Sequence, residues 1–218
     1  MKKGIAMRII LKLAVIALSA LMLAPQAGAE DAGLYAAPPP PDAAFVRVLN
    51  ADTATEAAVS VGGVSFLVPP AGLSPYSFVT RGSYDATIPG GTIAANFAAQ
   101  KFYTILLKAD GNAIVEDAPI ANPVHAGLYF YNATEAPLDL QARINGKQAT
   151  VFSAVAPGGT ASREVNAFEV SFVLANGAAT AFELPSIAMQ RQQGVSVVAI
   201  KNGDAITAFQ TVNAVANP

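Results

Sequence analysis

The sequence predicts an all-β protein made of two tandem antiparallel β-sandwich domains joined by a short linker. Apolar residues recur at every second position over short segments, as they do in strands that bury one face. Turn signals rich in Gly, Asn, Asp and Pro separate these segments. The same order of segments occurs twice along the chain, which indicates a duplicated β unit.

Residues 1–29 have the form of a secretory signal peptide and are set aside from the fold prediction. Residues 13–24 are apolar apart from Ser19, and Ala27-Gly28-Ala29 is a small-residue cleavage pattern. The start is basic, with Lys2, Lys3, Arg8 and Lys12. We predict Sec export to the periplasm with cleavage after Ala29. An uncleaved anchor is the less favoured alternative, because the apolar run is shorter than the roughly 20 residues of a membrane span.

The charge balance argues against nucleic acid as a partner. The whole chain has 13 Lys and Arg residues and 15 Asp and Glu residues, and four of the basic residues lie in the leader. Removal of the leader leaves nine basic residues and a formal charge of −6, the wrong sign for a phosphate backbone. The chain has no Cys, so in an oxidising compartment its core, and not a disulfide, holds the fold.

Residues 30–43 form a Pro-rich N-terminal arm. The four consecutive prolines at 38–41 fix φ and favour an extended polyproline II spacer. The Leu34-Tyr35 pair before them is either a docking element for a partner or part of a mobile tail, since chain termini are usually loose.

The first β-sandwich domain is predicted over residues 44–117. In its first strand Val46 and Val48 point to one face, and Arg47 and Leu49 point to the other. The further short strands alternate in the same way and lie near residues 57–61, 64–68, 84–88, 93–97, 103–107 and 114–115. About seven short strands between turn signals is the spacing expected of a β-sandwich.

A polar, Pro-bearing linker is predicted at residues 118–124, and the second β-sandwich domain at residues 125–218. Its first strand repeats that of the first domain 82 positions later, in the pairs Val46 and Leu128, Val48 and Phe130, and Asn50 and Asn132. A cleanly alternating strand at 138–144 ends at Asn145-Gly146, a strong hairpin signal because both residues of a type I′ turn need φ > 0.

The clearest repeat unit runs over residues 155–177. It predicts a turn, an extended arm, a strand with one apolar face and an Asn176-Gly177 turn, and residues 68–91 give a weaker echo of it. Two similar sandwiches in tandem explain both the length and the echo. A single larger sandwich is the alternative architecture.

The residue chemistry predicts no enzyme, no cofactor and no metal site. His125 is the only histidine, and a general base, an imidazole ligand or a Ser-His-Asp relay would all need it. No nucleophile elbow accompanies it, which favours a histidine between the domains or at the surface. One His and no Cys leave zinc, copper and haem without a ligand set. Asp110-Gly-Asn112 and Asn202-Gly-Asp204 lack the spacing of a calcium loop and are predicted to be hairpin turns.

Aromatic and polar residues supply the candidates for partner binding. Tyr129 and Tyr131 share a strand face and would form a small platform for a sugar; the alternative is that this face packs on the linker or on the other domain. Arg163, Glu164 and Asn166 either stabilise the start of a strand locally or form a partner-facing patch. The predicted partner-binding residues are Leu34, Tyr35, Tyr129, Tyr131, Arg163, Glu164 and Asn166.

Short motifs over nearly the whole mature chain carry a family resemblance. They include Gly33-Leu34-Tyr35 before the Pro-rich arm, the segment 45–51, and Phe102-Tyr103-Thr104 before an apolar strand. Val155-Ala-Pro-Gly follows, with Arg163-Glu-Val-Asn166 and then residues 170–177. On these residues the chain resembles the AlgF family of alginate biosynthesis proteins, and the shared motifs are structural.

The resemblance implies a non-catalytic periplasmic adaptor required for O-acetylation of an exported polysaccharide, alginate or an alginate-like or cellulose polymer. In that family a membrane-bound O-acyltransferase moves acetyl groups across the inner membrane, and SGNH-type acetyltransferases place them on the polymer. These enzymes are the implied partners, with weak or absent contact to the polysaccharide. The first repeat is also similar to the DUF4397 family of bacterial surface domains, which gives the alternative of a secreted surface or glycan-binding module.

Overall fold

The computed structural model describes residues 39–216 of the chain. These residues belong to one compact unit, Pro38–Pro218, and contain 17 strands and no helix. In this described range no helix is long and apolar enough to cross a membrane. The predicted signal peptide with its cleavage after Ala29, and the Leu34-Tyr35 pair, lie outside the described residues.

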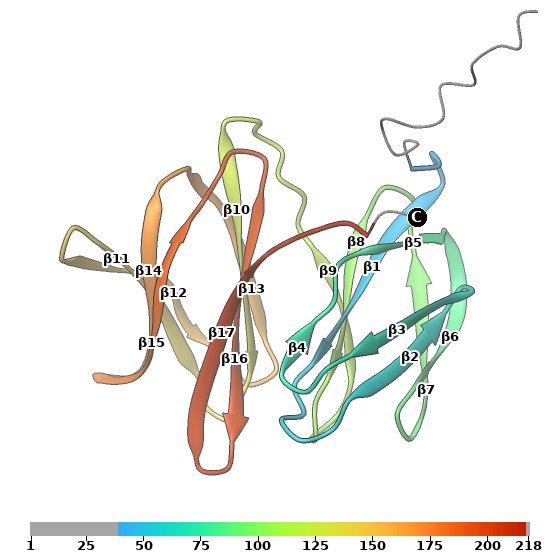
Figure 1. The fold of residues 1–218 in the computed structure, drawn as a ribbon, viewed down its shortest axis with the longest axis horizontal. Coiled ribbons are helices and arrows are strands. Elements are labelled where there is room, and N and C mark those ends of the chain that lie inside the picture. Colours follow the sequence, from blue (N-terminus) through green and yellow to red (C-terminus); the bar gives the residue numbers. More distant parts are fainter. Residues whose placement is uncertain (1–38, 217–218) are drawn as a thin grey trace, which may run out of the picture. The chain divides into compact units, whose positions relative to one another are not determined.

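Nine strands form the first sandwich (Figure 1). They are β1 (Ala43–Asn50), β2 (Ala57–Val61), β3 (Val64–Val68), β4 (Gly72–Leu73), β5 (Ser77–Thr80), β6 (Gly82–Ile88), β7 (Gly91–Phe97), β8 (Phe102–Leu107) and β9 (Ala113–Asp117). One sheet has the order β4-β1-β8-β9, with β5 also paired to β1, and the other has the order β3-β2-β6-β7.

Eight strands form the second sandwich with the same topology. They are β10 (His125–Ala133), β11 (Leu138–Ile144), β12 (Lys147–Val155), β13 (Thr160–Asn166), β14 (Glu169–Asn176), β15 (Ala179–Ala188), β16 (Gly194–Asn202) and β17 (Ala205–Val212). The sheet orders are β13-β10-β16-β17 and β12-β11-β14-β15. The predicted fold class is therefore confirmed, whereas the domain limits 44–117 and 125–218 stay predictions.

Each sandwich also contains one parallel pair of strands, which the alternation did not predict. β1 pairs in parallel with β8, and β10 with β16. All eight residues of β1 are buried, and so are the seven inner residues of β10. Parallel strands occur where both faces of a sheet are covered, and the covering of the second face is described below.

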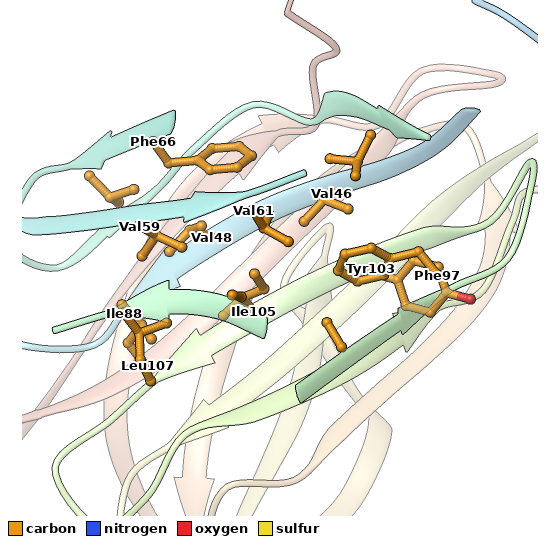
Figure 2. Packing of buried hydrophobic residues seen from close by; sticks show 14 of the residues in the cluster. Val46, Val48, Val59, Val61, Phe66, Ile88, Phe97, Tyr103, Ile105 and Leu107 are labelled. Atoms are coloured by element: carbon orange, nitrogen blue, oxygen red, sulfur yellow. The ribbon is translucent and has the colours of Figure 1, made fainter. Parts of the chain in front are cut away.

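The first core lies between the two sheets of the first sandwich (Figure 2). Val46 and Val48 of β1 point into it, as their alternation predicts, and meet Val59 of β2 in the same cluster. The Phe97 and Tyr103 rings pack with centroids 5.0 Å apart. Burial of a side chain of this size stabilises the fold by about 1.5–3 kcal/mol.

The second core is built from the equivalent positions of the second repeat. Leu128 and Phe130 of β10 lie in it with Leu140 of β11, Phe172 of β14 and Val197 of β16. Because each sandwich closes its own core, the alternative of a single larger sandwich is wrong.

One asparagine at the end of the first strand organises each sandwich. The Asn50 Nδ2 donates to the carbonyls of Thr55, Val68 and Pro69 at 2.9, 3.3 and 3.1 Å. Asn132, at the equivalent position, donates to the carbonyls of Ala136, Val155 and Ala156 at 2.8, 2.8 and 3.3 Å. Each amide thus satisfies backbone acceptors where the chain leaves one sheet for the other.

The predicted hairpin turn at Asn145-Gly146 is confirmed. The two residues have φ of 49° and 75°, and they connect β11 to β12, which pair antiparallel from Ile144 and Lys147 onward. Positive φ at both positions is the requirement of a type I′ turn.

Candidate functional site

An apolar layer joins the two sandwiches. Leu49 of β1 and Leu106 of β8 form one cluster with Tyr131 of β10 and with Val198 and Ile200 of β16. These residues have the opposite parity to those in the two cores. The central strands are therefore buried on both faces, which explains their nearly continuous apolar sequences and the parallel pairing.

A buried arginine lies within this contact. Arg47 of β1 is 1% exposed. Its Nε donates to Thr104 Oγ1 at 2.9 Å and its Nη2 to Tyr131 Oη at 2.7 Å and Ser196 Oγ at 3.1 Å. Its Nη1 donates to Asn213 Oδ1 at 2.8 Å. One side chain of the first sandwich thus binds three residues of the second repeat.

Asp117 at the end of β9 is the buried counter-charge. Its carboxylate accepts hydrogen bonds from Tyr76 Oη at 2.7 Å and Thr104 Oγ1 at 2.6 Å, and a further bond from Tyr131 Oη. Arg47 Nη2 lies 3.7 Å from its Oδ2. A charge pair withdrawn from water needs such additional hydrogen bonds to offset its desolvation.

The protonation states fit these directions of donation. Burial raises the pKa of Tyr76 and of Tyr131 well above the ordinary value, so both phenols keep their protons and donate to Asp117. Burial disfavours the charged Arg47 guanidinium, but its electrostatic interactions with Tyr131, Tyr76 and Asp117 outweigh burial and raise its pKa. The Arg47 Cζ also lies 4.3 Å from the Tyr76 ring centroid, a cation–π distance. We call Arg47, Tyr76, Thr104, Asp117, Tyr131, Ser196 and Asn213 the interface network.

Tyr129 and Tyr131 do not form an open platform. They are 8% and 1% exposed, and the Tyr129 Oη donates to the carbonyl of Ala118 at 2.6 Å. Burial raises the pKa of Tyr129 to about 12. The sugar-binding interpretation of this pair is wrong, because the face packs on the linker and on the first sandwich, as the alternative had it.

Glu164 holds the linker against the second sandwich. Its Oε1 accepts from the backbone N–H groups of Ala121 and Asn122 at 2.5 and 3.2 Å, and its Oε2 lies 3.0 Å from His125 Nδ1. The hydrogen bond from His125 and those from the backbone lower the pKa of Glu164. Both side chains are about a third exposed, so this group joins the linker to β13 at the surface.

The other predicted partner-binding residues are not brought into this group. Arg163 and Asn166 of β13 are exposed, and within residues 39–216 their side chains make no hydrogen bond. Their role in partner binding stays a prediction, as does that of Leu34 and Tyr35, which lie outside the described residues.

A polar cleft of about 790 Å³ opens where the loops after β1 and β10 meet the β8–β9 and β16–β17 turns. Lys108 Nζ lies 2.7 Å from Asp110 Oδ1, and Lys201 Nζ lies 2.7 Å from Glu135 Oε2. Four carboxylates line the cleft, including that of Asp52, and the ammonium groups among its lining residues are only those of Lys108 and Lys201. The excess negative charge disfavours an acidic polymer there. Across the described range no three His, Cys, Asp or Glu side chains gather to hold a metal.

The sequence interpretation missed the interface network. A charged residue inside the apolar segment 43–49 was the available signal, since Arg is rarely fully buried unless paired. The partners were beyond reach, because they stand 57, 84, 149 and 166 positions from Arg47.

Comparison with known proteins finds a family model and several relatives that match most of the chain. A family model described as "Alginate O-acetyl transferase AlgF" matches residues 15–196. The alginate biosynthesis protein AlgF of Pseudomonas syringae pv. tomato is 29% identical over 181 residues, 82% of this chain and 80% of that protein. The AlgF of Pseudomonas fluorescens is 30% identical over 181 residues, 82% of each. Among solved structures, the C-terminal domain of AlgF from P. aeruginosa covers 41% of this chain at 19% identity with a TM-score of 0.37.

Proposed function

Because the chain belongs to the alginate O-acetyl transferase AlgF family, we propose that it serves the O-acetylation of an exported polysaccharide, alginate or a closely related polymer. Its part is that of a non-catalytic periplasmic adaptor, which acts by contacts with other proteins. Periplasmic SGNH-type acetyltransferases are its partners, with a membrane-bound O-acyltransferase as a further one.

The interface network is the observation that carries the adaptor role. An adaptor that bridges two proteins must present two surfaces at a fixed spacing, because geometry decides whether both partners engage together. Arg47 and its hydrogen-bonded partners join the two sandwiches through a buried, fully paired group. A network with unpaired polar groups would lower the stability of the fold and would leave the orientation of the two sandwiches poorly defined.

The position of His125 supports a role without catalysis. It is the only histidine of the chain, and its Nδ1 contacts Glu164, a residue that also binds the linker backbone. The pair therefore serves to attach the linker. The negative charge of the cleft supports the further proposal that contact with an acidic polysaccharide is weak or absent.

The experiment is complementation of a strain that lacks the gene. We expect the deletion to abolish polymer acetate while the amount of polymer is kept, and the wild-type gene to restore the acetate. The tagged protein should co-purify with a periplasmic acetyltransferase. Unchanged acetate in the deletion strain would remove the role in acetylation.

A His125→Gln variant tests the absence of catalysis separately. Gln keeps a hydrogen-bond donor for Glu164 but has no imidazole to act as a base. We expect this variant to restore polymer acetate as the wild type does. If a folded, normally abundant His125→Gln protein leaves the polymer without acetate, the non-catalytic reading is wrong, whereas the role in acetylation stands.

A further inference from the structure

The end of the second repeat attaches to the first sandwich. After β17 the chain runs through residues 213–216, and Val215 forms a parallel bridge with Tyr76. The Tyr76 N–H donates to the carbonyl of Ala214 at 2.8 Å, and the Ala216 N–H donates to the carbonyl of Tyr76 at 2.7 Å. The final described residues thus act as a short extra strand beside Tyr76.

A break in one edge strand makes room for this strand. In the second sandwich β13 pairs with β10 without interruption over seven residues. The equivalent edge of the first sandwich is divided into β4 and β5, and Pro75, which has no N–H to donate, lies between them. The Ser74 side chain accepts from the Val48 N–H at 3.0 Å, and Tyr76 pairs with Val215 instead of with β1. The two repeats therefore differ at the place where residues 213–216 pair with Tyr76.

Asn213 connects the same segment to both sandwiches. Its Oδ1 accepts from Arg47 Nη1 at 2.8 Å and from Ser196 Oγ at 2.7 Å. Its N–H donates to the carbonyl of Gly194 at 2.8 Å. A Cβ added at Gly194 would lie 2.5 Å from Asn213 Nδ2, so the glycine leaves the space that the asparagine fills.

From these contacts we propose that residues 213–216 are a clasp, a segment that fixes the orientation of the second sandwich on the first. The linker at 118–124 is one connection between the sandwiches, and the clasp is a second one that closes after the chain has folded. It supplies the only Nη1 acceptor of Arg47 among the described residues and two backbone bonds to Tyr76. The clasp is a property of the fold and does not depend on the role in acetylation.

Amide exchange tests the attachment with a matched pair of variants. Ala216→Pro removes the N–H that donates to Tyr76, whereas Ala214→Pro keeps both bonds, because the Ala214 carbonyl is retained. The Tyr76 amide itself donates to the Ala214 carbonyl, which a chain that ends at Val212 lacks, so we expect this amide to lose its protection in that chain. It should lose part of its protection in Ala216→Pro, where one of the two bonds that hold the segment is gone, and keep it in Ala214→Pro. The Arg81 amide, which donates to the Asp42 carbonyl, should stay protected in all three. Full protection of the Tyr76 amide in the chain that ends at Val212 would overturn the clasp.

A distance measurement tests the orientation. Because the chain has no Cys, spin labels can be placed at Ser65→Cys on β3 and Thr150→Cys on β12, both at exposed positions. The full chain should give one narrow distance distribution, and a chain that ends at Val212 should give a broadened one. An equally narrow distribution in the truncated chain would overturn the proposal. If truncation unfolds the protein, the same pair of labels in Ala216→Pro gives the deciding result.

Discussion

At the scale of single residues, Arg47 combines a high cost of burial with a complete set of partners. Its guanidinium is almost entirely withdrawn from water and contacts Thr104, Tyr131, Ser196, Asn213 and Asp117. Removal of one member of such a group leaves the opposite charge buried without its partner. Arg47 therefore contributes to stability chiefly because its loss would leave the buried Asp117 carboxylate unpaired, and less through the strength of any single hydrogen bond.

We predict that Arg47→Met lowers the free energy of unfolding by about 3–5 kcal/mol, the range for breaking a buried charge pair. Met fills much of the volume but leaves the Asp117 carboxylate without a cation. Urea unfolding at pH 7 measures the loss. In the double variant Arg47→Met, Asp117→Asn the second change removes the unpaired charge, so the double variant should be more stable than Arg47→Met alone. Equal or lower stability of the double variant would contradict the assignment.

Glu164 predicts a pH dependence with a defined sign. Its pKa in the folded state is lowered from the ordinary 4.5 by the hydrogen bonds from His125 and the backbone of Ala121. A carboxyl of this kind contributes stability that is present above its unfolded pKa and is lost as the pH falls through its folded pKa.

The urea midpoint of the wild type should therefore exceed that of Glu164→Gln at every pH above the ordinary pKa of the carboxyl. Below that pH the two midpoints should converge, because protonation removes the wild-type carboxylate that accepts these hydrogen bonds. Asp139→Asn, on the far sheet, serves as a control that leaves the linker contact intact. A gap that persists unchanged far below the ordinary pKa of the carboxyl would show that Glu164 is not held as its anion.

At the scale of elements, the hairpin turns differ in how much space surrounds their glycines. Gly62 and Gly146 have φ of 57° and 75°, a region that costs a residue with a Cβ about 1–2 kcal/mol. A Cβ at Gly146 would meet nothing within 4 Å, whereas one at Gly62 would overlap Val79 Cγ1. Val79 lies in the first core.

Gly146→Ala should consequently lower the stability by about 1–2 kcal/mol, the cost of the backbone conformation alone. Gly62→Ala should cost about 1–3 kcal/mol more, because overpacking is added to that cost. Thermal or urea unfolding of both variants measures the difference. Similar losses would mean that Val79 can move aside.

The elements also show how far the sequence could be interpreted. Alternation predicted the strands and the faces of Val46 and Val48, because the core sets a period of two. It also placed Arg47 and Leu49 on the opposite face correctly. The alternation could not show that a second sandwich covers this opposite face. Side chains alternate between the two faces of a strand whether one face or both are buried, so the period of two is the same in both cases. For the same reason the sequence leaves open whether Tyr129 and Tyr131 form an exposed platform or pack on the linker or the other domain.

At the scale of the whole molecule, the duplication was visible because Asn50 and Asn132 and their flanking residues repeat in order. The differences between the copies decide how the molecule is held together, and they were not visible. Pro75 reads as an ordinary turn residue until the strand that pairs beside it is known. Residues 213–216 contain no motif, and their role follows only from the contacts they make.

The double burial of β1 has a consequence for the order in which the protein can be completed. Synthesis runs from the N-terminus, so β1 emerges before nearly every residue that surrounds it in the finished fold. Its outer side is covered only by β10 and β16, and the Nη1 of Arg47 finds its acceptor only in Asn213, 166 positions later. Contacts of such sequence separation form slowly. The outer face of β1 therefore stays uncovered in the nascent chain until β10 and β16 have been made, and an apolar face in that state is prone to aggregation.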